Sequence, residues 1–324
     1  MSNYFITGGA GFIGSEFLRV VLRNDPDCVI TNFDALTYAG RRENFEGLGF
    51  EDAGTRGHGN TGTRFFVKGD IRDSEAVMAT LPDECDAIFH LAAESHVDRS
   101  IESAHDFVTT NVLGTQVLLD CAREKRVKRF VHISTDEVMG SLPEDDSTFF
   151  TEDSPFEPNS PYAASKAAAE HLVRAASETF GLDTVITRCG NNYGPRQFPE
   201  KLIPLMISNA LADKPLPLYG DGLNVRDWIY VTDHCEAIWE VYKMAEPGSV
   251  YNIGARNTIR NIDVVTTILD ILDKPHSLIE PVEDRLGHDR RYAIDPARIE
   301  NEIGWSPKVS WEEGIRRTID WYRQ

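Results

Sequence analysis

The stretch Tyr4-Phe5-Ile6-Thr7-Gly8-Gly9-Ala10-Gly11-Phe12-Ile13-Gly14 joins a short apolar run to a cluster of glycines. The apolar run predicts a buried strand, and the spacing of Ile13, Phe17 and Val21 predicts a helix directly after the glycines. Glycines let the backbone turn tightly and approach a pyrophosphate, while the start of the helix offers unpaired N–H groups. The stretch therefore predicts a strand, a phosphate-binding loop and a helix that together hold a dinucleotide.

The next strand-like run, 29–34, ends in Asp34, about 20 residues after the glycines, where an acid binds the adenosine ribose 2′-hydroxyl. A carboxylate at that place repels the 2′-phosphate of NADP, and no arginine stands immediately beside it. The predicted cofactor is therefore NAD. Asp70, after the following strand, is either a residue that holds the adenine or an ordinary loop cap.

Strand-like and helical patterns alternate through the first part of the chain. The later strand-like runs are 64–70, 86–92, 129–134 and 183–188, and the later helical patterns are 103–125 and 162–180. This alternation predicts an α/β fold, a Rossmann-type doubly wound parallel sheet whose strand ends converge on the ligand. The Gly-rich polar stretch 47–64 has no periodicity and predicts a surface loop.

Beyond Gly190 the alternation weakens and proline recurs. This change predicts a smaller C-terminal α/β subdomain that binds the substrate. We expect an NAD-binding domain with the catalytic residues over 1–190 and a mainly substrate-binding subdomain over 191–324, with interleaved segments.

Composition excludes several classes of protein. The 324 residues carry a formal net charge of −19, which would repel a polynucleotide, so nucleic acid is not an expected partner. The five cysteines are scattered without a Cys-x-x-Cys pair, which predicts neither a disulfide framework nor a metal site. No apolar run approaches the ~20 residues of a membrane span, and no apolar leader precedes the first strand. We expect a cytoplasmic protein that does not enter a membrane.

A second motif, Tyr162-x-x-x-Lys166, opens the helical pattern 162–180. Its spacing puts both side chains on one helix face, where the lysine ammonium favours the phenolate form of the tyrosine. Tyr162 could then act as a base toward a sugar hydroxyl, while Lys166 also holds the nicotinamide ribose. Together with the glycine loop and Ser134-Thr135 at a strand end, this motif resembles the extended short-chain dehydrogenase/reductase superfamily. That resemblance implies oxidation at C4 of a nucleotide-linked hexose.

Asp136 and Glu137 follow the strand 129–134 as an adjacent acid pair. Once C4 is a ketone, one carboxylate can remove the acidified C5 proton while a protonated acid protonates the leaving C6 oxygen. Adjacent acids also raise each other's tendency to hold a proton. The pair therefore favours a dehydratase over a 4-epimerase, which needs no such elimination, although an acid pair is also typical of a solvated helix start.

Longer stretches resemble the dTDP-glucose 4,6-dehydratase family over nearly the entire chain. They read LAAESHVDRSI, STDEV, PYAASKA, TRCGNNYGPRQFPEKLIPL, GLNVRDWIYVTDHCEAI, YNIG and DRLGHDRRYAID. The resemblance implies a homodimer with tightly held NAD that converts dTDP-glucose to dTDP-4-keto-6-deoxyglucose. It further implies that Asp136 is the general acid, Glu137 the general base, and Tyr162 the base at O4, with Thr135 and Lys166 also in the catalytic set.

The same resemblance, with the glycine and acid motifs, sets the expected binding residues. Those for the cofactor are Gly8, Gly11, Phe12, Ile13, Gly14, Asp34, Ala35, Leu36, Thr37, Asp70, Ile71, Leu91, Ala92, Ala93, Glu94, Thr110, Ser134, Tyr162, Lys166 and Asn192. Those for the substrate are Ser95, Thr135, Asn191, Lys201, Leu202, Pro217, Leu218, Tyr219, Arg226, Asn261, Arg285 and His288. Arg226 and Arg285 suit a diphosphate because arginine binds phosphate oxygens in pairs.

The chain departs from the usual pattern of that family at Met139, Ala35, Gly190 and Arg196, where Tyr, Lys, Ser and Tyr are usual. None of these departures removes a catalytic group. The alternatives left open are a nucleotide-sugar 4-epimerase, a dehydratase of another nucleotide hexose such as UDP-glucose, and a dinucleotide-binding sensor without turnover. A sensor has no need of an acid, a base and a phenol together.

Overall fold

The computed structural model describes residues 1–53, 63–144 and 147–324. The described chain divides into two compact units, each assembled from separate segments. The first unit comprises Met1–Thr135, Ser160–Arg188 and Cys235–Tyr251, and the second comprises Asp136–Asn159, Cys189–His234 and Asn252–Gln324.

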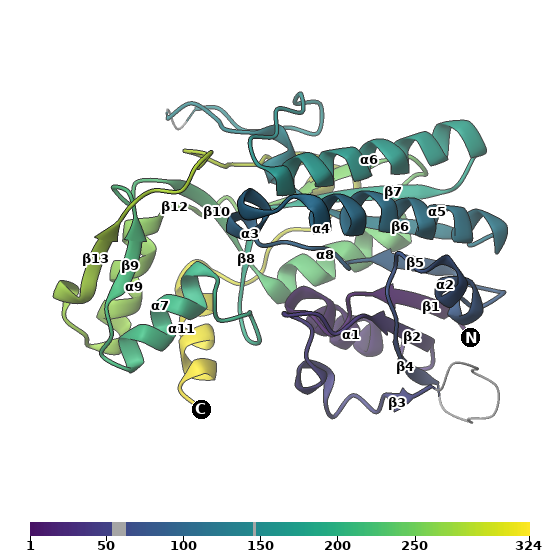
Figure 1. Cartoon of the computed structure of the whole chain (residues 1–324), viewed down its shortest axis with the longest axis horizontal. Helices are drawn as coiled ribbons and strands as arrows, with labels where there is room; N and C mark the ends of the chain where they lie inside the picture. Colours follow the sequence, from purple (N-terminus) through teal and green to yellow (C-terminus); the bar gives the residue numbers. More distant parts are fainter. Residues whose placement is uncertain (54–62, 145–146) are drawn as a thin grey trace. The chain divides into compact units, whose positions relative to one another are not determined.

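The main sheet is centred on the first unit and has the strand order β11-β7-β6-β5-β1-β2-β4-β3 (Figure 1). Its strands are β1 Asn3–Thr7, β2 Val29–Asp34, β3 Glu51–Asp52, β4 Arg64–Lys68, β5 Ala87–His90, β6 Arg129–Thr135, β7 Thr184–Cys189 and β11 Val250–Ile253. β1 pairs in parallel with both β2 and β5, β2 with β4, and β5 with β6. The strand order runs outward from β1 in both directions, so the predicted doubly wound parallel sheet is confirmed.

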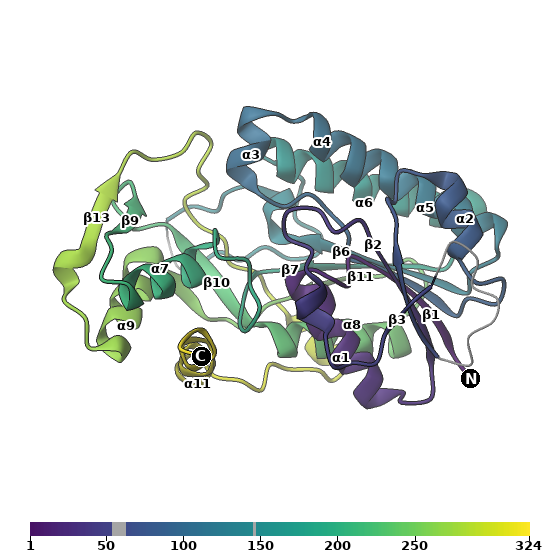
Figure 2. The same cartoon turned by 60° about the horizontal axis from the view of Figure 1, so that its bottom comes forward.

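Helices cover both faces of this sheet. Figure 2 shows α1 Phe12–Asn24 and α8 Val231–Met244 on one face, and α2 Ser74–Thr80, α5 Thr115–Glu124 and α6 Pro161–Phe180 on the other. Successive residues of β1 serve the two layers: Tyr4 meets Trp239 of α8, whereas Phe5 packs on Phe33 in the core beneath α2, α5 and α6. Burial on both faces explains why the central strands carry apolar residues at successive positions, as in Tyr4-Phe5-Ile6 of β1 and Ala87-Ile88-Phe89 of β5.

Two stretches differ from their predicted form. Glu51 and Asp52, inside the predicted loop 47–64, form β3 and pair in parallel with β4. Arg42 holds Asp52 through two hydrogen bonds of 3.0 and 2.7 Å, so this edge strand forms from polar contacts without an apolar pattern. Residues 54–62 of that loop lie outside the described residues.

The predicted helix 103–125 is the second difference. It consists of α4 His105–Phe107, a π-helix η2 Val108–Gly114, and α5, preceded by α3 Val97–Glu102. The backbone hydrogen bonds of a π-helix span five residues rather than four, and such turns often occur at functional sites. The apolar spacing of the stretch predicted a helix but not this change of period.

The second unit contains two small sheets, with strand orders β12-β10-β8 and β13-β9. Its strands are β8 Asn191–Tyr193, β9 Leu216–Tyr219, β10 Val225–Tyr230, β12 Thr258–Arg260 and β13 Ile279–Val282. Its helices are α7 Leu202–Leu211, α9 Asn261–Leu272, α10 Ala297–Glu302 and α11 Trp311–Tyr322, and its short 3-10 turns are η3 Asp136–Met139 and η4 His276–Leu278. A further 3-10 turn, η1 Arg42–Phe45, belongs to the first unit. β10 pairs in parallel with β8 and antiparallel with β12, which confirms a smaller mixed α/β subdomain. None of the described helices is long and apolar enough to span a bilayer.

Candidate active site

The glycine loop leads from β1 into α1, as predicted. Gly8 has φ +75°, and a Cβ there would lie 2.6 Å from the Ala92 nitrogen. A Cβ on Gly14 would lie 2.1 Å from the Gly8 carbonyl oxygen. Side chains at these two positions are therefore excluded, and the loop backbone and the N-terminus of α1 stay open to a close anionic ligand.

Asp34 ends β2 and is 8% exposed. Its carboxylate accepts hydrogen bonds from the Ala10 N–H at 2.9 Å and the Leu36 N–H at 2.8 Å, one on each oxygen. Burial raises the pKa of Asp34, and these two backbone donors oppose the rise. Each carboxylate oxygen keeps a second lone pair, which can accept from a ribose hydroxyl.

Asp70 acts as a loop acceptor in the structure, which is one of the two roles that its position suggested. Its carboxylate binds the Arg72 side chain, with a shortest separation of 2.6 Å, and accepts from the Arg72 N–H at 2.9 Å. The hydrogen bonds from Arg72 hold the pKa of Asp70 below its ordinary value. Asp70 is thus an anionic loop acceptor close after β4.

The parallel pairing brings several predicted cofactor residues to one edge of the sheet. β1, β2, β5 and β6 all end there, followed by the glycine loop, Ala35–Thr37, Leu91–Glu94 and, at the end of β6, Ser134 and Thr135. Thr7 connects two of these ends, because its hydroxyl accepts from the Ala92 N–H at 3.2 Å. Thr110 lies in η2 and Ile71 packs against Gly114 of the same helix.

Tyr162 and Lys166 occupy the first turns of α6, which Ser160 caps by accepting from the Ala163 N–H at 3.1 Å. Tyr162 is 8% exposed and meets Phe107 edge to face, with ring centroids 6.4 Å apart. The Lys166 ammonium donates to the Ile133 carbonyl at 2.7 Å, which fixes it beside β6. Both members of the motif are thus held at the strand end that carries Ser134 and Thr135.

Two buried imidazoles lie behind Lys166. His90 contacts the hydroxyls of Thr7 and Thr115 at 2.9 Å each, and its ring lies 5.3 Å from that of His132. Burial, with a contribution from Lys166, lowers the pKa of His90 to about 3 and that of His132 well below its ordinary value. Both rings are therefore neutral near pH 7, and Lys166 carries the cationic charge of this group.

In the second unit, η3 holds the acid pair: Asp136 is 1% exposed and Glu137 is partly buried. Burial is the largest cause of the raised pKa of Glu137, and Asp289 adds to the rise. The positive charges of Arg285, Lys201 and Arg226 oppose it. The sequence predicted a raised pKa from the adjacent acid, whereas loss of water is its largest cause in the structure, because a buried carboxyl favours its neutral form.

Arg226, 4% exposed on β10, is held in a fixed position. It donates to the carbonyls of Val225 at 2.7 Å and Asp289 at 2.8 Å, and its guanidinium lies 4.2 Å from the centre of the Tyr292 ring. Burial lowers its pKa, and the charges of Glu137 and Asp136 raise it. Arg226 therefore lies within the field of both acids.

Sequence reasoning missed part of this cluster. Asp289 accepts from Asn159 Nδ2 at 2.6 Å and from the Tyr292 hydroxyl. The motif DRLGHDRRYAID contains Asp289 and Tyr292, but only Arg285 and His288 were taken from it. The clue was an acid and a tyrosine three residues apart, which is too common to identify a site without the fold.

The other predicted substrate residues all lie in the second unit except Ser95 and Thr135. Asn191 is in β8, Lys201 stands at the N-cap position of α7 and Leu202 begins this helix. Pro217, Leu218 and Tyr219 are in β9, and Asn261 begins α9. The Oδ1 atom of Asn261 is buried without a hydrogen-bond partner in the described chain. Such an orphaned acceptor is typical of a ligand site.

His288 lies next to Tyr219, with ring centroids 6.2 Å apart. Its Nδ1 lies 2.6 Å from Asp284, yet burial and the charge of Arg285 lower its pKa to about 4. The contact is therefore a hydrogen bond from a neutral imidazole rather than an ion pair. Asn192, predicted for the cofactor, binds His234 at 2.8 Å through Oδ1 and donates to the Gly190 carbonyl at 3.1 Å.

Gly190 is one of the departures from the family pattern that the structure explains. A Cβ there would lie 2.8 Å from the Asp227 carbonyl oxygen, so the backbone of this chain comes closer than a serine would allow. Arg196, another departure, has φ +68°, and Met139 is buried at the end of η3.

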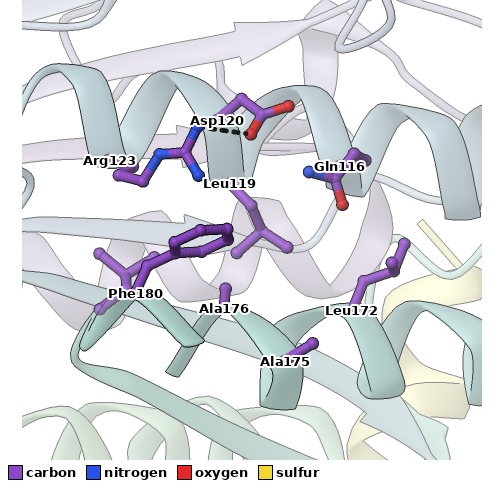
Figure 3. Close-up of a pocket in the computed structure, with 9 residues that line it drawn as sticks. Gln116, Leu119, Asp120, Arg123, Leu172, Ala175, Ala176 and Phe180 are labelled. Atoms are coloured by element: carbon purple, nitrogen blue, oxygen red, sulfur yellow. Dashed lines mark ion pairs between the residues drawn. The ribbon is translucent and has the colours of Figure 1, made fainter. Parts of the chain in front are cut away.

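An apolar hollow lies on the helical face of the first unit between α5 and α6 (Figure 3). It is lined by Gln116, Leu119, Asp120, Arg123, Leu172, Ala175, Ala176, Phe180 and Leu182. None of the predicted site residues is among them, so this hollow is distinct from the candidate active site. Within the described residues, no group of His, Cys, Asp and Glu side chains is placed to hold a metal ion.

A dinucleotide-binding sheet with Tyr162 and Lys166 at its strand ends defines an enzyme of the short-chain dehydrogenase/reductase class. The family model described as GDP-mannose 4,6 dehydratase matches residues 5–318. A dTDP-glucose 4,6-dehydratase of Escherichia coli is 48% identical, over 98% of this chain and 92% of its own. The chain belongs to the dTDP-glucose 4,6-dehydratase family.

Solved structures agree with this assignment. The dTDP-glucose 4,6-dehydratase DesIV of Streptomyces venezuelae, solved with NAD bound, has a TM-score of 0.92 and 48% identity, covering 99% of this chain and 97% of its own. A UDP-glucose 4-epimerase of Thermus thermophilus, also solved with NAD, has a TM-score of 0.87 and 32% identity, covering 99% of both chains. The fold is thus shared with epimerases, and identity is higher to the dehydratase.

Proposed function

We propose that the protein converts dTDP-glucose to dTDP-4-keto-6-deoxyglucose and water. The observation that carries this proposal is the acid pair Asp136-Glu137, which follows the last residue of β6 directly and lies in the field of Arg226. Relatives that are 48% identical over nearly their full length support the nucleotide and the sugar.

The residues of the first unit fit NAD. Gly8 and Gly14 leave no room for side chains, Asp34 retains acceptor capacity on both oxygens, and the end of β5 lies beside the glycine loop. Bound NAD would supply a reversible hydride acceptor for the oxidation at C4 and the later reduction at C6, so no external oxidant would be consumed. Asp34 would hold the adenosine ribose, and Lys166 the nicotinamide ribose.

The chain's own residues divide the proton transfers among them. Tyr162 removes the proton from the O4 hydroxyl as C4 becomes a ketone, and Lys166 stabilises its phenolate. Glu137 removes the C5 proton, and Asp136 gives a proton to the C6 oxygen, which leaves as water. Glu137 then returns its proton to C5. A raised pKa suits Glu137 because it makes this carboxylate a stronger base.

The second unit supplies the nucleotide contacts in this proposal. Arg226, Arg285 and His288 contact the nucleotide diphosphate, while Pro217 to Tyr219 surround the base. Thr135 and Ser95 hold the glucose. The fixed position of Arg226 over the Tyr292 ring reduces the entropy lost when the diphosphate binds.

The assembly proposed is a homodimer formed through the helical face of α5 and α6. Val108 and Leu113 of η2 and Phe180 of α6 are 51%, 52% and 56% exposed, more than expected for a helix face that only covers its own sheet. A C2 pair is the commonest closed assembly. We also assign the protein to the cytoplasm, because its cysteines are buried thiols that suit a reducing compartment.

The second candidate is a nucleotide-sugar 4-epimerase, favoured only by the shared fold. Mass spectrometry after incubation with dTDP-glucose decides between them, since dehydration lowers the product mass by one water and epimerisation leaves it unchanged. A parallel incubation with UDP-glucose tests the choice of nucleotide. Product of unchanged mass would refute the dehydratase assignment.

A further inference from the structure

The side-chain amide of Asn111 makes three hydrogen bonds, one as acceptor and two as donor. It is 2% exposed and lies in η2, directly after the predicted cofactor residue Thr110. Its Oδ1 accepts from the Glu94 N–H at 2.9 Å, and its Nδ2 donates to the Glu94 carbonyl at 2.9 Å. The amide thus pairs with both backbone groups of one residue in the loop after β5.

The second Nδ2 hydrogen of Asn111 reaches α6. It is donated to the Ser165 hydroxyl at 2.9 Å, and that hydroxyl donates in turn to the Tyr162 carbonyl at 2.7 Å. The Tyr162 N–H donates to the Ser100 hydroxyl at 3.3 Å. Both backbone groups of Tyr162 are therefore bound by side chains, and one of them connects to Glu94 through Ser165 and Asn111.

The π-helix accounts for this arrangement. The Asn111 carbonyl accepts from the Thr115 hydroxyl at 2.6 Å. This side chain therefore pairs a backbone carbonyl of η2 at the point where the π-helix ends and α5 begins. No other side chain of similar size reproduces the three amide contacts: aspartate has no donor and would oppose the Glu94 carbonyl, and leucine would leave a buried N–H and carbonyl unpaired.

We propose that Asn111 is a positioning residue that holds the Glu94 loop, where NAD is expected, in a fixed relation to the helix that carries Tyr162 and Lys166. This inference rests on the proposed function and deepens it. Misplacing a reacting group by about 1 Å can cost on the order of 10²-fold in rate. Asn111 acts through Glu94 and Tyr162 rather than on the substrate.

Three variants test the proposal. Asn111→Asp should speed hydrogen exchange of peptide 91–96, lower the NAD content of the purified protein, and slow C4 oxidation on the order of 10²-fold. Ser165→Ala removes only the link from Asn111 to the Tyr162 carbonyl. It should therefore leave the NAD content and the hydrogen exchange of peptide 91–96 unchanged, and slow oxidation about tenfold at unchanged KM for the nucleotide sugar. Asn24→Asp, at the end of α1, makes the same chemical change where Nδ2 donates only to the Val20 carbonyl, and should match the wild type.

Hydrogen exchange and NAD content need no sugar substrate, so they decide the proposal even if dTDP-glucose is not turned over. Wild-type exchange at 91–96 together with wild-type NAD content in Asn111→Asp would overturn it. The rate loss of the double variant, Asn111→Asp with Ser165→Ala, should also be smaller than the product of the two single losses, since both substitutions break the same chain of contacts. Fully multiplicative losses would overturn the proposal, because they would show that Asn111 and Ser165 act independently. If Asn111→Asp does not fold, the split of kcat from KM in Ser165→Ala decides, and an unchanged kcat overturns the proposal.

Discussion

At the scale of single residues, the proposed chemistry depends on how each acid is surrounded. Glu137 is desolvated but faces three cationic side chains, so it can ionise at a raised pKa. The imidazoles of His90 and His132 near Lys166 are neutral, because burial lowers the pKa of both rings. Burial thus favours the neutral form of a carboxyl in the second unit and of two imidazoles in the first, so the same physical cause makes Glu137 a stronger base and keeps the two rings uncharged.

Tyr162→Phe and Glu137→Gln should stop the reaction at different steps. The first variant should abolish oxidation, and the second should permit oxidation but slow elimination, by ~10²–10⁴-fold for a lost acid or base. Rapid-scan absorbance should show enzyme-bound NADH in the Glu137 variant and none in the Tyr162 variant. The opposite pattern would reverse the two assignments.

The raised pKa of Glu137 also predicts a pH dependence of stability. Because the folded state holds this proton more tightly than the unfolded state, its contribution is fully present below the ordinary pKa of 4.5 and is lost as pH rises through the folded pKa. Glu137→Gln should therefore gain Tm relative to the wild type as pH increases from 4 toward 8. Glu178→Gln, at an exposed position of α6, is the control and should show a flat difference. A gain for Glu137→Gln that is equal at both pH values would contradict the assigned shift.

At the scale of elements, the attachment of α6 to the sheet includes a buried ion pair. Arg188 at the end of β7 binds Glu170 of α6 at 2.9 Å, and the two side chains are only 6% and 2% exposed. A buried pair adds little over apolar packing, but removing one partner leaves an uncompensated charge. The pair therefore makes the position of α6, and with it that of Tyr162, sensitive to a distant substitution.

Glu170→Gln should lower the free energy of unfolding by about 3–5 kcal/mol, measured by urea denaturation. The matched control is Glu313→Gln on α11, which breaks an exposed pair with Arg317 four residues on and should cost less than ~0.5 kcal/mol. Equal losses in the two variants would mean that Arg188 finds another partner when Glu170 is gone.

At the scale of the whole molecule, the proposed dimer predicts a mass. Light scattering at micromolar concentration should give about twice the 36.3 kDa chain mass. The double variant Val108→Arg with Leu113→Arg should be monomeric, since it places charge on the exposed face of η2. Met244→Arg, on a comparably exposed residue of α8, should remain dimeric. A wild-type monomer with full activity would refute the dimer.

The cofactor prediction belongs to the same scale, because it concerns the protein as purified. Denaturing it should release NAD, since Asp34 would repel a 2′-phosphate and the hydride returns within each turnover. Liquid chromatography of the released nucleotide provides the measurement. NADP in that fraction, or free NADH accumulating during turnover, would contradict the proposed cycle.

Local sequence patterns determine much of this fold. The run Tyr4–Thr7, the glycines after it and the alternation through 183–188 predicted the parallel sheet, because burial on both faces requires apolar strands and a tight turn requires glycine. The Tyr162 and Lys166 pair was recognisable because four residues make about one helical turn. The resemblance of long motifs indicated the family and the residues to examine.

Only the tertiary structure determined those features that form when segments separated in the sequence come into contact. The π-helix that turns Asn111 toward Glu94, the strand β3 and the cluster of Asp289 and Tyr292 around Arg226 have no local signal, since each requires partners far along the chain. The raised pKa of Glu137 is of the same kind: the sequence by itself placed two acids side by side, but the loss of water around one of them comes from tertiary packing. Desolvation is a property of the whole fold, and no pattern of neighbouring residues encodes it.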